Sequence, residues 1–303
     1  MQAGDGLIYS SLKSLLKQRS MARLLQRGSK NVHARQSGHH LSTQKGRGMD
    51  FAESRLYQPG DDVRTMDWRV TAKTGKAHTK IFQEERERPV LLYVDCRPSM
   101  FFGTRGKYKS VVAAEIASLL TWKMWLDGDR VGGVVETVSE GIEMRPSRSM
   151  SGISRWLKHI ADSTQNLLNN TDKKSSGLDF DGLRHIANSG SQIIIISDFQ
   201  GYSETNRQQL LGLTRKAAVH LVSIADPFEQ QLPDVSGLRV TDSLASLFIH
   251  PKQKNLAKKY QQAYQQRQQL LQKDARKVGA GLIEVLTNDE QNHVLMNISR
   301  GLR

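Results

Sequence analysis

The sequence predicts an α/β fold: a mostly parallel sheet flanked by helices, with an irregular and partly β N-terminal extension. From residue 89 onward, short apolar runs of strand length alternate with longer segments of helical pattern. This alternation is typical of a parallel, doubly wound sheet. Three of the apolar runs also end in an acid, at Asp95, Asp198 and Asp226. Because parallel strands share one carboxyl edge, these acids are expected at that edge, where open α/β sheets bind ligands.

The N-terminal part of the chain is expected to differ from the rest. Residues 6–27 combine leucines near helical spacing with Lys and Arg, which predicts an amphipathic helix. Such a helix either packs on the body of the protein, the favoured interpretation, or lies against a partner or a membrane surface. Residues 28–48 are rich in Gly, Ser, Gln and His, as in a loop, and residues 49–88 show only one short strand, at 79–83.

The remaining elements follow the alternation in order. Strands are expected over 89–95, 130–136, 140–145, 192–197, 218–224 and 280–286, with shorter pieces at 238–241 and 247–249. Helices are expected over 105–126, 151–163, 179–188, 205–217, 252–277 and 288–301. The domains expected are a basic amphipathic helix and loop (1–37), a segment packed on the core (38–88), and an α/β domain with peripheral C-terminal helices (89–303).

Composition narrows the class of protein. With 303 residues and 38% hydrophobic residues the chain can bury a sizeable core, and its one cysteine suits a reducing cytoplasm. No segment reaches the roughly 18–20 apolar residues of a transmembrane helix, although contact with anionic lipid headgroups stays open. The net charge of +14 suggests nucleic acid, but the basic residues are spread out and no nucleic-acid motif is present. A solvated basic face, or a patch for an acidic protein, is therefore favoured.

The densest set of motif residues lies between 46 and 100. It reads R-L-Y-Q-P-G-D-D-V-R-T-M-D-W at 55–68, continues through Glu85-Arg86 to Asp95 and Ser99-Met100, and is followed by G-D-R-V-G at 128–132. In this order the residues resemble the bacterial domain-of-unknown-function family fifty-eight. Those proteins have a von Willebrand A-like domain and are often encoded beside MoxR-type AAA+ ATPases. The resemblance implies a von Willebrand A-like, Rossmann-like sheet.

The resemblance also implies a metal site. Asp95 matches the first acid of the related D-x-S-x-S motif, Ser99 matches its second hydroxyl, and Asp198 matches a late acid. These oxygens would partly ligate Mg²⁺ or Mn²⁺, the only cofactors considered, because hard cations prefer carboxylate and hydroxyl ligands. Arg97 stands in place of the first hydroxyl, and its guanidinium would repel a cation or pair with Asp95 or Asp198 itself. A metal site and a buried ion pair are the two alternatives.

The charged segment 49–88 has two interpretations of equal weight. Near balance of sign suggests a salt-bridged network that fixes an irregular segment, whereas fixed residues in a loop suggest a surface for a partner. The candidate partner-binding residues are Arg55, Tyr57, Asp61, Asp62, Arg64, Asp67, Trp68 and, at the strand end, Arg97.

No catalytic residue is predicted. The chain has no phosphate-binding G-x-x-x-x-G-K-[ST] and no G-x-S-x-G elbow, and Cys96 is expected to be a packed side chain. The resemblance implies a cytoplasmic, non-enzymatic adaptor that acts with a MoxR-type AAA+ ATPase in chaperone-like assembly or maturation of client proteins. Its docking face would be the carboxyl edge of the sheet, so Asp95→Ala should weaken binding and leave the fold intact. The alternatives are a nucleic-acid-associated protein using the N-terminal segment and helix 252–277 and, least favoured, a metal-dependent hydrolase.

Overall fold

The chain forms two compact units. The computed structural model describes residues 4–33, 49–84, 87–169, 177–232, 238–241, 246–249, 254–289 and 298. Unit 1 comprises residues 1–30 and 88–303, and unit 2 comprises residues 31–87. Residues 12–30 of the first helix therefore fall in the same unit as the sheet.

Unit 1 is built on a six-stranded sheet of order β10-β7-β6-β3-β4-β5. Its strands are β3 (Pro89–Asp95), β4 (Arg130–Glu136), β5 (Gly141–Ser147), β6 (Gln192–Ser197), β7 (Ala218–Ala225) and β10 (Gly281–Leu286). Every neighbouring pair is parallel except β4 and β5. The predicted mostly parallel α/β sheet is confirmed. Because β3 lies between β4 and β6, the strand order reverses beside it, which is where such sheets bind ligands.

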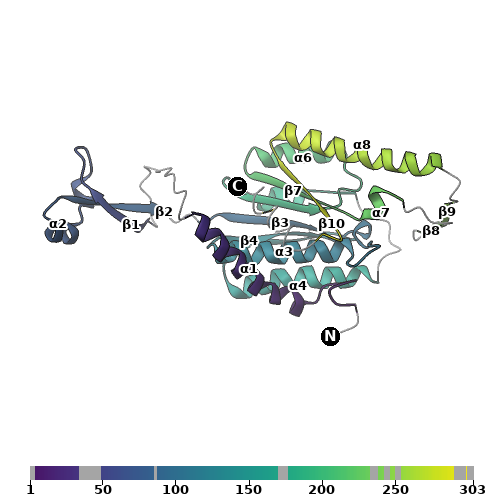
Figure 1. Ribbon diagram of the computed structural model, residues 1–303, viewed down its shortest axis with the longest axis horizontal. Coiled ribbons are helices and arrows are strands. Elements are labelled where there is room, and N and C mark those ends of the chain that lie inside the picture. The colour runs from purple at the N-terminus through teal and green to yellow at the C-terminus, as the bar shows by residue number, and fades with distance from the viewer. Residues whose placement is uncertain are drawn as a thin grey trace. The chain divides into compact units, whose positions relative to one another are not determined.

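Helices cover both faces of this sheet (Figure 1). The helices of unit 1 are α1 (Leu12–His33), α3 (Lys109–Leu126), α4 (Met150–Leu167), α5 (Asp181–Ile186), α6 (Glu204–Thr214), the short α7 (Pro227–Gln230) and α8 (Lys254–Val278). Alternate residues of β3 enter two cores: Leu92 packs with α3 and α4 residues, and Leu91 packs with α5, α6 and α8 residues. Burial on both faces explains why β3 is continuously apolar rather than alternating.

Helix α1 packs on the body of unit 1, as the favoured interpretation predicted. Leu15 is fully buried, and its carbonyl accepts hydrogen bonds from Ser118 Oγ at 2.8 Å and Trp122 Nε1 at 3.2 Å. The Arg19 guanidinium lies 5.0 Å from the ring centroid of Trp125. One of the basic residues of α1 is therefore used inside the protein.

Unit 2 holds more regular structure than the sequence predicted. Strands β1 (Met49–Leu56) and β2 (His78–Glu84) pair antiparallel, and the short helices η1 (Val63–Thr65) and α2 (Trp68–Thr74) lie between them in the chain. Only β2 was expected. The sequence of β1, M-D-F-A-E-S-R-L, mixes charged and apolar residues, and a register shift between Phe51 and Glu53 breaks its alternation.

The C-terminal part is described in pieces. Strands β8 (Leu238–Thr241) and β9 (Ser246–Ile249) form a separate antiparallel pair. The helix expected over 288–301 lies almost wholly outside the described residues. Among the residues that are described, no helix has the length and apolar character to cross a membrane.

Candidate functional site

The carboxyl edge of the sheet of unit 1 gathers the acids that the sequence singled out. Asp95 ends β3, Asp198 follows β6 and Asp226 follows β7. Their exposed fractions are 0%, 5% and 0%, respectively. Since buried carboxylates are stable only when they are paired or hydrogen-bonded, their partners define what this edge can do.

Asp95 is paired by Arg97, two residues further along the chain. Arg97 donates from Nε to Oδ1 at 3.0 Å and from Nη2 to Oδ2 at 2.7 Å, a bidentate contact. The backbone N–H of Arg97 and the hydroxyl of Ser197 also donate to Asp95, at 2.9 and 2.6 Å. Nη2 of Arg97 lies 3.7 Å from Oδ1 of Asp198. Of the two alternatives for this site, the structure therefore shows the buried ion pair of Arg97 with the two aspartates.

Asp198 is paired by a residue that the sequence analysis missed. Lys109, the first residue of α3, is fully buried and donates from Nζ to Asp198 Oδ2 at 2.8 Å and to Glu229 Oε1 at 2.7 Å. The other carboxylate oxygen of Glu229 accepts from the backbone N–H of Asp226 at 3.0 Å. We call Asp95, Arg97, Lys109, Asp198 and Glu229 the ion-pair cluster.

A strained backbone turn lies beside the ion-pair cluster. Phe199 has φ of 52°, an uncommon value for a residue with a side chain, and such values concentrate at sites that the surrounding structure holds in place. This turn brings Gln200 back over the strand end. Its N–H donates to Asp198 Oδ1 at 2.9 Å and its carbonyl accepts from Arg97 Nη1 at 3.2 Å.

The electrostatics of the cluster keep its cations charged. Burial alone lowers the pKa of Lys109, but the carboxylates of Asp198 and Glu229 outweigh it and raise that pKa above its usual value. Burial likewise opposes ionisation of Asp198, yet Lys109 holds the pKa of Asp198 below its usual range. Burial also lowers the pKa of Arg97, and the Asp95 carboxylate more than compensates. These shifts favour the charged forms of Arg97, Lys109 and Asp198.

The donors present do not fit a divalent cation in this arrangement. Both oxygens of Asp95 accept from Arg97 and Ser197, and Asp198 accepts from Lys109 and the backbone. Ser99 Oγ is buried and has no hydrogen-bond partner among the described residues. It is therefore the one predicted metal ligand whose oxygen is not already engaged in a hydrogen bond or ion pair. Across those residues, no group of three or more His, Cys, Asp or Glu is placed to hold a metal ion.

Arg97 is also closed to a partner. Its side chain is 3% exposed, and Nε, Nη1 and Nη2 all donate within the protein. Binding a partner's carboxylate through Arg97 would first require breaking these contacts, so the expected direct contact is not available in this structure.

Asp226 forms a second centre beside the cluster rather than joining it. Its carboxylate accepts from the backbone N–H of Thr104 at 2.9 Å and from Thr287 Oγ1 at 2.7 Å. It also caps α7 through the N–H of Phe228. Asp226 thus ties the loop after β3 to the turn after β10.

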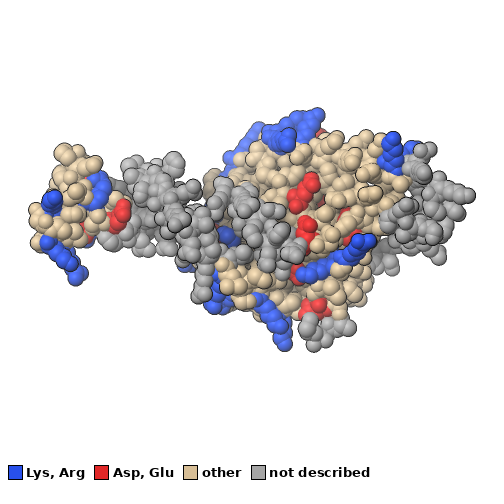
Figure 2. Space-filling view, viewed as in Figure 1, with Lys and Arg blue, Asp and Glu red and all other residues tan. Residues whose placement is uncertain are grey.

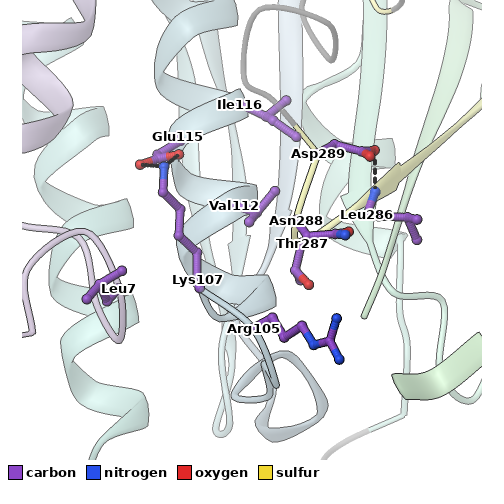
Figure 3. A pocket seen from close by; sticks show the side chains of 11 residues that line it. Leu7, Arg105, Lys107, Val112, Glu115, Ile116, Leu286, Thr287, Asn288 and Asp289 are labelled. Carbon is purple, nitrogen blue, oxygen red and sulfur yellow. Dashed lines mark hydrogen bonds and ion pairs between the residues drawn. The ribbon is translucent and has the colours of Figure 1, made fainter. Parts of the chain in front are cut away.

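A pocket of about 380 Å³ opens next to that turn. Figure 3 shows Arg105 and Lys107 on the loop before α3, with Thr287 and Asp289 on the turn after β10. Lys107 is ion-paired with Glu115 at 2.7 Å, and Asp289 accepts from the backbone N–H of Leu286. Those two polar pairs are satisfied internally, and the pocket wall includes no residue of the ion-pair cluster.

In unit 2 the acids of the family motif are structural. Asp61 accepts from Arg55 Nη2 at 2.7 Å and from the N–H of Gln58. Asp62 caps η1, and Asp67 caps α2 while also accepting from Ser54 Oγ at 2.6 Å. Asp61 thus forms a salt bridge, as the first interpretation of this segment expects, whereas Asp62 and Asp67 cap helices and Asp67 also accepts from a hydroxyl.

Several residues in and beside this motif are exposed. Trp68 is 66% exposed and Val63 is 58% exposed. Arg64 and Arg69 are exposed, while Tyr57 is half-buried and its N–H donates to the carbonyl of Ala77. An aromatic ring so exposed at the first residue of a capped helix is unusual for a side chain whose only role is structural.

Three residues of the edge carried weak sequence signals. Lys109 is the one charged residue directly before the apolar run S-V-V-A-A of α3, and Asp226-Pro-Phe-Glu229 has the spacing of a capping box. Ser197 precedes Asp198 at the strand end. None of these patterns reveals that Lys109 and Glu229 meet, because they lie 120 positions apart.

The charge on the surface is scattered. On the face shown in Figure 2, basic side chains of unit 1 occur both at the edges and inside the face, with acidic ones among them, and the described residues form no continuous basic stripe. The distribution matches the spread of Lys and Arg in the sequence.

Comparison with known proteins identifies the family. Residues 53–270 match the family described as "Protein of unknown function DUF58". The uncharacterized protein Rv1480 of Mycobacterium tuberculosis is 32% identical over 206 residues, which are 68% of this chain and 64% of that protein. The uncharacterized protein Mb1516 of Mycobacterium bovis matches with the same identity and coverage. The chain thus spans just under two thirds of the length of these relatives, at 64%.

Two solved structures are more distantly similar. A conserved hypothetical protein, BatB from Bacteroides thetaiotaomicron, aligns with a TM-score of 0.39 and 14% identity, over 71% of this chain and 98% of that one. An aerotolerance-related membrane protein from Bacteroides fragilis aligns with a TM-score of 0.41, at the same identity and coverage. Neither similarity is close enough to bear on function. The match over residues 53–270 and the 32% identity to the mycobacterial proteins show that the chain belongs to the DUF58 family.

Proposed function

We propose that this protein is a non-enzymatic, cytoplasmic adaptor that binds a MoxR-type AAA+ ATPase and takes part in chaperone-like assembly or maturation of client proteins. The observation that carries the proposal is the outward-facing Trp68 of unit 2, which is 66% exposed. Tryptophan and arginine are the residues most enriched among those that dominate protein–protein binding energy. Trp68 is also held in place, because Asp67 caps its helix.

The charges of unit 2 indicate the kind of surface it would meet. Its motif acids are used internally, as caps and as the partner of Arg55. Its bases Arg64, Arg69, Lys73 and Lys76 are exposed. Unit 2 therefore presents apolar side chains among cations, which complements an acidic surface with an apolar pocket.

The carboxylates of the ion-pair cluster are already paired within the protein. Each carboxylate of the ion-pair cluster is neutralised by Arg97 or Lys109, so none is left as a general base or a metal ligand. The proposed docking contacts consequently lie in unit 2 and not at Asp95, Ser99 and Asp198, which were expected to form the docking face.

The test is the affinity for a MoxR-type ATPase from the same organism, measured by biolayer interferometry with the wild type and Trp68→Ala. Loss of this side chain is expected to weaken binding by more than about tenfold, the effect of a typical dominant interface residue. Leu211→Ala is the matched control, because Leu211 is a 40% exposed residue of α6 in unit 1. Equal affinity of wild type and Trp68→Ala, or equal losses in both variants, would refute this docking surface.

A further inference from the structure

Two buried side-chain cations stand at the carboxyl edge, where the family resemblance placed a divalent ion. Arg97 is 2% exposed and Lys109 is 0% exposed. Each carries one positive charge, so together they supply the +2 of one Mg²⁺ or Mn²⁺. We infer that Arg97 and Lys109 take the place of a divalent cation, and that the fold of this edge and any recognition through it are independent of metal.

The contacts of Lys109 are those of a bridging cation. Its Nζ lies 2.8 Å from a carboxylate oxygen of Asp198 and 2.7 Å from one of Glu229. These acids come from different places in the fold, the end of β6 and the short helix α7. Lys109 itself begins α3, so a single ammonium group joins three elements at one point.

Arg97 takes the place of the divalent cation at the neighbouring strand, β3. It neutralises Asp95 through two hydrogen bonds and approaches Asp198 to 3.7 Å, so one guanidinium spans the ends of β3 and β6. Two residues further along the chain, Ser99 Oγ is buried without a hydrogen-bond partner in the described part of the chain. The side-chain nitrogens of Arg97 donate to Asp95 and to the carbonyl of Gln200 and not to Ser99, whereas a hard cation takes carboxylate and hydroxyl oxygens alike as ligands.

This assignment makes a prediction about a chain that lacks the two cations. Without them, the carboxylates of Asp95, Asp198 and Glu229 would lose their positive partners, and carboxylate oxygens are ligands that a hard cation prefers. Replacing Arg97 by Ser would also add a hydroxyl, and replacing Lys109 by Met would remove the competing charge while filling similar space. The double variant Arg97→Ser/Lys109→Met should therefore bind Mn²⁺.

The first experiment uses the wild-type chain. Its thermal midpoint is measured with EDTA, with millimolar Mg²⁺ and with millimolar Mn²⁺, and should change by less than about 1 °C, because an ion without a site gives no linkage stabilisation. A midpoint that falls in EDTA and is restored by Mg²⁺ or Mn²⁺ would overturn the inference.

The second experiment uses the double variant, with Mn²⁺ binding followed by calorimetry and by the thermal midpoint. Mn²⁺ should raise the midpoint and bind at least about tenfold more tightly than to the wild type. Adding Asp198→Asn should abolish the gain, and Arg184→Ser, which breaks an exposed ion pair with Asp181, should produce none. A double variant that neither gains Mn²⁺ affinity nor is rescued by Mn²⁺ overturns the assignment.

One consequence concerns the adaptor and rests on the proposed function: docking of the ATPase should not require a metal bound to this protein. If the proposed function were refuted, the expected results of both metal experiments would stay the same, because neither experiment uses a partner. A metal-dependent wild type would overturn the inference even if Trp68→Ala abolished docking, so the two failures are distinguishable.

Discussion

Substituting Asp95 by Ala should destabilise the protein, in contrast to the sequence-based expectation of an intact fold. The side chain is completely buried and accepts four hydrogen bonds, three from Arg97 and one from Ser197. Its loss leaves the buried Arg97 guanidinium without its carboxylate and the Ser197 hydroxyl without its acceptor. Breaking a buried ion pair by removing one partner costs about 3–5 kcal/mol. Asp198, 3.7 Å from Nη2, offsets part of that cost, so a value near the lower end, about 3 kcal/mol, is expected.

The assay is thermal or urea unfolding followed by circular dichroism. For a unit of this size each kcal/mol lowers the thermal midpoint by roughly 2–4 °C, so a decrease of about 6–12 °C is expected. The control is Asp181→Ala, because Asp181 pairs with Arg184 on the surface with side chains 49% and 58% exposed, and such a pair is worth about 1 kcal/mol or less. The double variant Asp95→Leu/Arg97→Met should be more stable than Asp95→Ala, since no unpaired charge remains. Equal losses for Asp95→Ala and Asp181→Ala would refute the reasoning.

Three further predictions test other parts of unit 1. Burial and then the nearby Asp95 carboxylate raise the pKa of Glu136 to about 7. Because the folded state then binds a proton that the unfolded state has released, the free energy of unfolding should fall by at most about 3 kcal/mol as the pH rises from about 4.5 to 7. Glu136→Gln should flatten this pH dependence in urea titrations, and an unchanged slope would contradict the prediction. Leu15→Ala should cost about 2–5 kcal/mol because the residue is fully buried, whereas Leu24→Ala, at 63% exposure, should change stability by less than about 0.5 kcal/mol; similar effects would show that α1 is not part of the core. Cys96 is buried, and burial raises the pKa of its thiol, so a thiol reagent should modify the native protein at least about a hundredfold more slowly than the urea-unfolded chain; rapid native labelling would exclude this environment.

The sheet could be predicted because its signals are local. Burial on both faces makes β3 and β6 continuous apolar runs, and their boundaries agree with the sequence prediction. Strand β1 was missed because its charged residues and its register shift leave no apolar period. Helix α2 was missed for a different reason: with seven residues it spans barely two turns, and its capping acid, Asp67, was interpreted as part of a charge network.

The ion-pair cluster could be predicted only in part. The pairing of Asp95 with Arg97 follows from two residues that flank one position at a strand end, and the sequence was sufficient to propose it. The pairing of Lys109 with Asp198 and Glu229 depends on how three elements meet in space, at separations of 89 and 120 positions. A single sequence, considered by itself, carries no signal for such contacts. The same reason explains why exposure of Trp68 could not be distinguished from burial in advance.

The most direct test of the adaptor account is hydrogen–deuterium exchange of the full chain, alone and with the MoxR-type ATPase. Binding through unit 2 predicts slower exchange of the backbone amides of η1 and α2, from residues 63 to 74, because docking on Trp68 restricts their opening. The amides of residues 95–100 and 198–201, at the ion-pair cluster, should exchange at the same rate in both samples. Protection at the cluster with no change over 63–74, or no protection anywhere in the chain, would contradict the account.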